Sequence, residues 1–248
     1  MLRTWLLLIA AWLAVAPASA QHPGGSPYEL RWGPALAVTG VGAATFAIGR
    51  RASARIELMR AGELELLSRD DVLPFDRYAT YRASPLAKRI SDYVGYGSAL
   101  LPLSLLASPR ARDHFGQIAL LYGQVVVLDN GVTSLIKNTV RRRRPYVYND
   151  AYPLAKRLGR DAHRSFFSGH TSNTAANSFF TARVYADFHP DASARALVWT
   201  GSALLPAVTG LTRVLSGNHY WTDVLVGYVV GAGIGLLAPR LHLQQVED

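Results

Sequence analysis

Three separated stretches of the sequence carry residue types that could bind and react with a phosphate group. The first, residues 137–145, reads Lys-Asn-Thr-Val-Arg-Arg-Arg-Arg-Pro and follows an apolar run. Lys137 and Arg144 are two helical turns apart, which favours one face, while Pro145 biases Arg144 out of the helix. An ammonium point charge and a planar guanidinium together suit phosphate oxygens. The alternative is a basic cluster beside a membrane that sets topology or binds anionic lipid.

The second stretch, residues 165–172, reads Ser-Phe-Phe-Ser-Gly-His-Thr-Ser and precedes a helical pattern. A Ser168-Gly169 turn at a helix N-terminus offers free backbone N–H groups and the positive end of the helix dipole, and both attract anions. His170 beside such a turn could give a proton to a leaving oxygen near neutral pH. The alternative is an ordinary N-cap with a lone histidine.

The third stretch, residues 212–223, reads Thr-Arg-Val-Leu-Ser-Gly-Asn-His-Tyr-Trp-Thr-Asp. His219 and Asp223 are four positions apart, so one helical turn would make them neighbours. A carboxylate on one ring nitrogen fixes the tautomer and makes the other nitrogen a better nucleophile or base. Arg213 could supply a further positive fork. The alternative is a capping aspartate next to a surface histidine.

These blocks occur in the order K-x6-R-P, S-G-H and R-x5-H-x3-D. Together they resemble the signature of the type 2 phosphatidic acid phosphatase and haloperoxidase superfamily, over residues from about 117 to 240. Two positions depart from the usual form, because Phe167 stands in place of a proline and Thr212 in place of a serine. Neither change removes a charge or a proton carrier, so they affect the expected shape of the phosphate site and not the expected reaction.

The resemblance implies a role for each motif residue. It makes His219 the nucleophile, Asp223 the carboxylate that orients it and His170 the general acid. It assigns phosphate binding to Lys137, Arg144, Ser168, Gly169 and Arg213. The implied reaction passes through a phosphohistidine, with the cationic side chains stabilising charge where a metal would otherwise be needed. The sequence has no acidic cluster for Mg²⁺ or Zn²⁺, and we expect neither a metal nor another cofactor.

The expected substrate is a phosphate monoester or pyrophosphate of a lipid, such as a phosphatidic acid-like, polyprenyl pyrophosphate-like or lipid A-like molecule. Related possibilities are a soluble exported acid phosphatase of broad specificity and a vanadate-dependent haloperoxidase. A different class is a non-enzymatic membrane protein that binds acidic lipid through residues 141–144. That reading leaves the spaced His170, His219 and Asp223 unexplained. We expect no nucleic-acid partner, and we expect residues 141–143 to form a solvated or headgroup-facing surface.

Composition sets the broad class of the protein. Half of the 248 residues are hydrophobic and only 17% are charged, against about 25% in average soluble domains. The absence of cysteine excludes disulfide frameworks, thiol nucleophiles and cysteine-based metal sites. The net charge is +9, and residues 137–165 hold nine Lys or Arg against two Asp. An anionic partner is therefore expected at this segment.

Short apolar segments recur along the chain, and strand-like alternation is absent. The segments are 32–49, 93–109, 115–136, 170–182, 196–212 and 224–239. Several reach only the lower limit of a membrane span, which needs roughly 17–25 apolar residues. We predict an all-α, membrane-embedded helical bundle of about six helices, of the phosphatidic acid phosphatase and haloperoxidase type. Residues 50–92 mix charged and apolar residues, which predicts an amphipathic helix at an interface or a solvated connection.

The start of the chain has the pattern of a secretory leader. Arg3 precedes an apolar run over residues 5–15, and Ala18-Ser19-Ala20 gives an A-x-A end. We predict a signal peptide at 1–20, an N-terminal helix with its amphipathic connection at 21–92 and a helical phosphatase core at 93–248. An uncleaved anchor is the alternative.

The count of spans conflicts with the expected side of the site. Three apolar segments precede Lys137, so a site after three full spans would face inward if the mature N-terminus is outside. We expect a bacterial-type inner membrane location with the site facing the periplasm, which requires either that one segment, for example 32–49, does not span or that the leader is not an export signal. A soluble periplasmic protein is the alternative.

Overall fold

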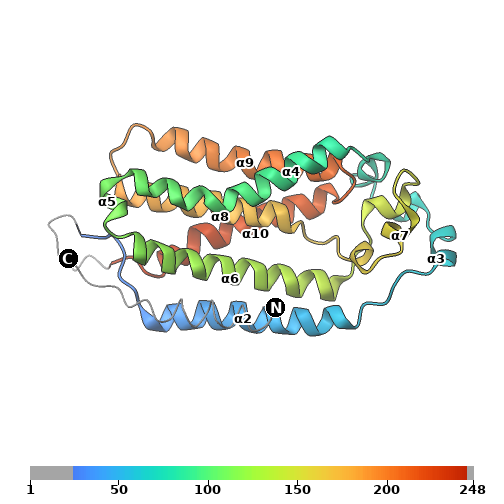
Figure 1. The fold of residues 1–248 in the computed structure, drawn as a ribbon, viewed down its shortest axis with the longest axis horizontal. Helices are drawn as coiled ribbons and strands as arrows, with labels where there is room; N and C mark the ends of the chain where they lie inside the picture. The colour runs from blue at the N-terminus through green and yellow to red at the C-terminus, as the bar shows by residue number, and fades with distance from the viewer. Residues whose placement is uncertain (1–24, 245–248) are drawn as a thin grey trace.

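Six helical rods lie side by side along one direction in the computed structural model, which describes residues 25–244 (Figure 1). They are α2 (Trp32–Ala54), α4 (Pro85–Gly97) with its continuation η3 (Ser98–Ala107), α6 (Phe115–Val140), α8 (Gly169–Phe188), α9 (Arg195–Leu215) and α10 (Trp221–Arg240). Within the described residues, extended pairing is limited to one isolated bridge between Tyr28 and Leu243. The predicted all-α bundle of about six helices is confirmed.

Short elements gather beyond one end of the bundle, where Figure 1 places α3 and α7. They are α3 (Ala61–Glu65), η1 (Arg69–Asp71), η2 (Arg77–Tyr81), η4 (Pro145–Tyr148), α7 (Leu154–Arg157) and η5 (Arg160–His163). We call residues 55–84 and 141–165 the cap. The short α5 (Pro109–Arg112) lies at the opposite end of the bundle.

Residues 50–92 form a connection of short elements between two longer helices and not one amphipathic helix, the first of the two alternatives that the sequence left open. Helix α2 ends at Ala54, and α4 begins at Pro85, where Ser84 caps it by accepting from the N–H of Ala87. Between them the apolar residues serve a different purpose, because buried Met59 packs with Tyr146 and Val147 of the second cap segment. Burial against a distant segment decides the conformation here, and it outweighs local helical periodicity.

Small residues let the helices approach closely. A Cβ at Gly227 of α10 would lie 2.6 Å from the carbonyl oxygen of Ser168, and one at Gly235 would lie 2.5 Å from that of Ala176. These glycines sit on one face of α10 and press it against the backbone of α8. The backbone N–H of Ser168 also donates to the carbonyl of Asp223 at 2.9 Å. The beginnings of α8 and α10 are therefore fixed to each other at the cap end.

Three helical segments in the described chain are long and apolar enough to cross a membrane: Trp32–Ala54, Phe115–Tyr148 and Trp221–Arg240. Their outer faces expose large apolar side chains, such as Leu36 at 60% and Val229 at 70%. Helix α8 instead buries polar residues against its neighbours, among them Thr171, Ser172 and Asn177. The leader predicted at 1–20 lies outside the described residues.

Candidate active site

The cap ends of α6, α8, α9 and α10 bring all eight residues singled out in the sequence to one region. Lys137 lies in the last turn of α6, and Arg144 in the extended stretch that follows. Gly169 opens α8, Arg213 lies in the last turn of α9, and His219 precedes α10. We call Lys137, Arg144 and Arg213 the cationic cup. All three side chains are buried. Arg144 contacts His219, and Arg213 shares the carboxylate of Asp92 with His170.

His219 is almost fully buried, with 1% of its surface exposed. Its Nδ1 lies 3.4 Å from Oδ2 of Asp223, and its Nε2 lies 3.1 Å from Nη1 of Arg144. A proton on Nδ1 therefore faces the carboxylate, which leaves the lone pair of Nε2 on the side of the cup. Burial, followed by the charges of Arg144 and Lys137, holds the pKa of His219 well below its usual value. The lowered pKa favours the neutral form of the imidazole.

The turn before His219 depends on Gly217. This residue has a φ of +61°, and a Cβ there would collide with the carbonyl oxygen of Arg82. The backbone N–H of His219 donates to the carbonyl of Arg213 at 3.3 Å, which closes the turn. Two motif residues are thus positioned by the same short segment, and a side chain at Gly217 would disturb both.

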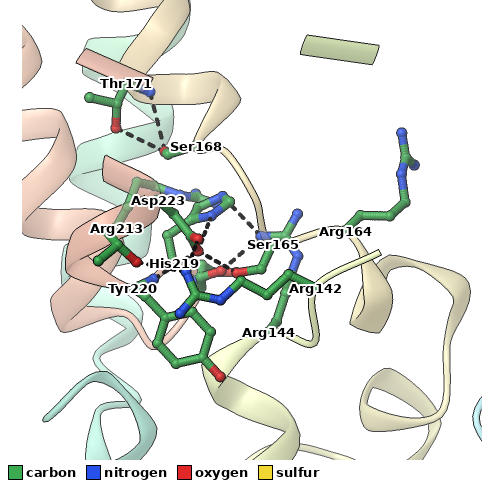
Figure 2. A network of polar contacts seen from close by, with 12 residues as sticks. Arg142, Arg144, Arg164, Ser165, Ser168, Thr171, Arg213, His219, Tyr220 and Asp223 are labelled. Atoms are coloured by element: carbon green, nitrogen blue, oxygen red, sulfur yellow. Dashed lines mark hydrogen bonds and ion pairs between the residues drawn. The ribbon is translucent and has the colours of Figure 1, made fainter. Parts of the chain in front are cut away.

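Asp223 is held by donors from several elements, and Figure 2 shows them converging on its carboxylate. Oδ2 accepts from the hydroxyl of Ser165 at 2.5 Å and from the N–H of Tyr220 at 3.0 Å. Oδ1 accepts from Nη1 of Arg142 at 2.6 Å. The carboxylate is fully buried, and these donors fix its direction toward His219.

Arg142 corrects the expectation for residues 141–143. Arg141 and Arg143 are exposed as predicted, but Arg142 is half-buried and bridges two carboxylates. Its second nitrogen lies 2.7 Å from Oδ2 of Asp76, a buried residue from the first cap segment. Asp76 also accepts from the N–H and hydroxyl of Thr222. The sequence does not reveal this ion pair, because Asp76 lies far from Arg142 along the chain and Arg142 is one of four consecutive arginines.

We predict that Arg142→Gln destabilises the protein by about 3 kcal/mol, because it leaves two buried carboxylates without their cation. Thermal unfolding in neutral detergent measures the effect. Arg143→Gln is the matched control: its side chain is exposed, and its loss should cost less than about 0.5 kcal/mol. Equal stability of the two variants would show that the bridge contributes nothing.

Lys137 lies along the beginning of α8. Its Nζ donates to the carbonyl of Arg164 at 3.0 Å and to that of Ser165 at 3.4 Å. A Cβ at Gly169 would approach Cε of Lys137 to 3.3 Å, so the glycine keeps room for the lysine stem. No carboxylate lies within ion-pair distance of this ammonium group in residues 25–244.

Ser168 is the N-cap of α8. Its hydroxyl accepts from the N–H of Thr171 and lies 2.8 Å from that residue's Oγ1, a pair that Figure 2 shows apart from the Asp223 network. The capping interpretation of Ser168 is therefore confirmed, and its contact with phosphate stays a prediction. The N–H of Gly169 begins the helix and has no partner among the bonds of the described chain, so it is free to meet an anion.

Arg144 leaves the helix as predicted. Helix α6 ends at Val140, Arg141 has a φ of 54°, and Arg144 is extended. The guanidinium of Arg144 donates to the carbonyl of Asn218 at 2.9 Å and forms an ion pair with Asp161 at 3.2 Å. These contacts place a planar fork directly beside Nε2 of His219.

A carboxylate that the sequence analysis missed joins the remaining two motif residues. Asp92 of α4 has its Oδ1 3.0 Å from Nη1 of Arg213 and 3.2 Å from Nε2 of His170. Its Oδ2 lies 2.7 Å from the ammonium of Lys88. The signal in the sequence was the polar pair Ser91-Asp92 at the edge of an apolar segment, since Ser91 also contacts Arg213. Helix α4 therefore forms one wall of the site.

His170 is strongly influenced by these charges. Burial, followed by the charge of Arg213, lowers the pKa of His170 to about 3, while Asp92 acts in the opposite direction. The ring also packs against Tyr96 of α4, with ring centroids 5.6 Å apart. The charges of Arg213, Arg144 and Lys137 act on both histidines, so both rings lie near the cationic cup.

The model of the PAP2 superfamily matches residues 118–247, just over half of the chain. The chain belongs to the PAP2 superfamily. This match contains every motif residue of the cationic cup and both histidines. Asp92, Asp76 and the first cap segment precede it.

Individual PAP2 proteins resemble this chain over its second half. Decaprenylphosphoryl-5-phosphoribose phosphatase of Mycobacterium tuberculosis is 30% identical over 135 residues, which are 54% of this chain and 65% of that protein. Lipid A 1-phosphatase of Rhizobium johnstonii is 32% identical over 117 residues, 45% of this chain and 43% of that protein. The chain therefore matches less than two thirds of the length of these relatives.

A solved structure is also similar. It is the crystal structure of the first transmembrane PAP2 type phosphatidylglycerolphosphate phosphatase from Bacillus subtilis, with 22% identity and a TM-score of 0.41. The comparison covers 84% of this chain and 90% of that one.

Proposed function

We propose that this PAP2 protein is a metal-independent phosphatase that hydrolyses a phosphate monoester or pyrophosphate of a lipid. The observation that carries the proposal is the convergence of three buried cations on His219, whose Nε2 faces the guanidinium of Arg144 at 3.1 Å. Three positive side chains can hold the oxygens of one phosphate group while a neutral imidazole approaches its phosphorus.

In the first step, Nε2 of His219 attacks phosphorus and the bond from phosphorus to the leaving oxygen breaks. His170 gives a proton to that oxygen, and Asp223 stabilises the imidazolium that forms. In the second step, water attacks the phosphohistidine and loses a proton to His170. The bond between phosphorus and Nε2 of His219 breaks and phosphate leaves. His219 is then free again and His170 is protonated again, so the enzyme returns unchanged.

The residues of the cup have distinct roles in this scheme. Arg144 lies beside the attacking nitrogen and is placed to hold an equatorial oxygen. Lys137 and the free N–H of Gly169 hold a second oxygen, with Ser168 capping the helix that presents Gly169. Arg213 holds the oxygen nearest His170. These fixed charges supply the stabilisation of the transition state that a metal ion gives other phosphatases.

A lipid substrate agrees with the apolar helices that lead to the site. The cup lies at the cap end of three segments that could cross a membrane, so an acyl or prenyl chain beside them would place its phosphate near the cup. The relatives named above act on lipid-linked phosphates. We further propose that the protein resides in a bacterial-type inner membrane with the site facing the periplasm. Reporter fusions after residues 70, 112 and 150 test the orientation.

A phosphate-release assay of the purified protein in neutral detergent tests the proposed activity. We expect faster release from a phosphatidic acid or polyprenyl diphosphate than from glycerol phosphate at equal concentration. EDTA should leave the rate unchanged, because side chains supply the positive charge. Release from soluble esters alone would contradict the lipid assignment. Absence of release from every ester, or bromination that depends on added vanadate and halide, would contradict the phosphatase assignment.

A further inference from the structure

A second positively charged cavity lies in the cap, outside the cationic cup. It has a volume of about 540 Å³, and its walls include Arg141, Arg142, Arg143, His163 and Tyr220. An adjacent hollow of about 260 Å³ shares Arg141 and His163 with it. We propose that this cavity, called here the arginine pocket, binds a phosphate group and that its occupation supports the catalytic site through Arg142.

Local backbone structure explains why the arginines separate. The left-handed conformation of Arg141 ends α6 and turns the chain into an extended stretch. The carbonyl of Arg142 accepts from the N–H of Ser165 at 3.0 Å, and the N–H of Arg144 donates to the carbonyl of Ala162 at 2.8 Å. Successive side chains of an extended stretch point to opposite faces. Arg142 and Arg144 therefore reach Asp223 and His219, while Arg141 and Arg143 remain exposed.

The wall of the arginine pocket carries more positive than negative charge, whereas the adjacent hollow also contains Glu57 and Glu63. Neither Arg141 nor Arg143 has a carboxylate within ion-pair distance in residues 25–244. Asp71 is the acidic residue in the wall, and it accepts from the N–H of Ser68. The buried Asp76 behind the wall is already paired with Arg142. Guanidinium groups with free donors bind phosphate oxygens in bidentate geometry, which makes a phosphate group the ligand that this chemistry favours.

The surroundings of the pocket fit a phosphate carried by a lipid as well as a free one. Val72 and Leu73 lie in the wall, and Leu73 is 60% exposed. Leu58, in the adjacent hollow, is 62% exposed. The pocket lies at the cap end of the apolar helices, the level at which lipid headgroups meet protein. Both sources present the same phosphate oxygens to the arginines.

Two residues that line the pocket, Arg142 and Tyr220, also contact the catalytic site. The guanidinium of Arg142 lies 4.1 Å from the ring centre of Tyr220, and both residues donate to the carboxylate of Asp223. Four consecutive arginines repel one another, and a phosphate held by Arg141 and Arg143 reduces this repulsion. The stretch that carries Arg142 and Arg144 then becomes more ordered. Occupation should therefore raise the phosphatase rate; this coupling rests on the proposed function, whereas the binding itself does not.

Phosphatidylglycerol is a suitable probe, because its phosphate is a diester and not a substrate of the proposed reaction. We expect mixed micelles containing it to raise kcat/KM for p-nitrophenyl phosphate by about fivefold over neutral micelles. The variant Arg141→Gln/Arg143→Gln should lose this increase and bind weakly to phosphatidylglycerol vesicles. Arg110→Gln/Arg112→Gln removes the same charge from α5 at the other end of the bundle and should keep both properties.

Calorimetry with inorganic phosphate distinguishes the two sources of the ligand. Two phosphates bound to the wild type and one to the Arg141→Gln/Arg143→Gln variant would support a pocket that also takes free phosphate. One phosphate in each protein, together with the loss of vesicle binding, would support a headgroup site. If the variant and the α5 control behave alike in both assays, the proposal is wrong. If the protein hydrolyses no ester but still binds vesicles through Arg141 and Arg143, the proposed function is wrong and the proposed phosphate binding by the arginine pocket is supported.

Discussion

Replacement of His219 with glutamine is expected to reduce phosphate release by roughly 10³-fold or more. Glutamine retains similar length and can still face Asp223, but it has no lone pair that can attack phosphorus. His219 is buried between the carboxylate at 3.4 Å and Arg144 at 3.1 Å, so water has little room to replace the ring as nucleophile. The residual rate measures what the cup contributes without a covalent step.

Rapid quenching with a substrate labelled in its phosphate group provides the direct measurement. The wild type should retain acid-labile, alkali-stable label on the protein during turnover, and the His219→Gln variant should retain none. His189→Gln is the matched control, because His189 lies at the far end of α8 and contacts Ser108 there. A loss of less than tenfold in the His219 variant, about 1.4 kcal/mol, would be too small for a nucleophile.

Residues that act within one turn or one short block were accessible from the sequence. Pro145 keeps Arg144 out of the helix, and His219 contacts Asp223 four positions along the chain, as predicted. The two-turn helical spacing of Lys137 and Arg144 is not realised, because α6 ends at Val140. Interactions over a few residues are predictable because the local backbone fixes them. The overall helical class follows from the apolar segments in the same manner.

Contacts between distant segments were not accessible. Asp92 reaches Arg213 and His170 only because α4 packs beside α8 and α9, and the polar pair Ser91-Asp92 does not by itself identify these partners. The sequence predicts that Arg142 belongs to a solvated run of arginines, whereas the structure pairs it with Asp76. The mixed pattern of residues 50–92 suggested a helix, yet burial of Met59 against Tyr146 produced a cap. In each case a tertiary partner decides the outcome.

Ser168 shows an intermediate situation. A serine and a glycine before a helical pattern predict both an N-cap and an anion site, and the same N-terminal geometry serves both. The hydroxyl is committed to Thr171, whereas the N–H of Gly169 is free. Sequence reasoning therefore placed the turn at the N-terminus of the helix but could not decide which atom of the turn is available to a ligand.

Replacement of His170 with glutamine should lower the hydrolysis of an alkyl phosphate by about 10²–10⁴-fold, the range of general acid catalysis. The loss should be much smaller for p-nitrophenyl phosphate, because its phenolate leaves without a proton. Comparing kcat/KM for the two esters in wild type and variant measures this difference, because it reports the phosphorylation step and not the later attack of water that His170 also assists. An equal loss on both esters would mean that His170 positions the phosphate and does not protonate the leaving group.

The second part of this prediction concerns pH. Arg213, Arg144 and Lys137 lower the pKa of His170, and Asp92 is the facing group that raises it. A bound phosphate dianion adds negative charge beside the ring and raises the pKa further, toward the range in which His170 can act as an acid. Asp92→Asn removes one negative charge and must lower that pKa. The alkaline decline of kcat for an alkyl phosphate should then begin at lower pH.

The Asp92→Asn variant also tests whether Asp92 influences the proton on His170 or only holds neighbouring side chains in place. For p-nitrophenyl phosphate, the position of the alkaline decline should not move in Asp92→Asn, because no proton is transferred to the leaving group. Asp92→Glu retains the charge and should keep the decline closer to that of the wild type. If Asp92→Asn lowers the rate uniformly at every pH with both esters, Asp92 holds Arg213 and His170 in place and has no influence on the proton. The carboxylate that the sequence did not reveal would then be part of the scaffold, and His170 would depend on the bound phosphate alone for its protonation.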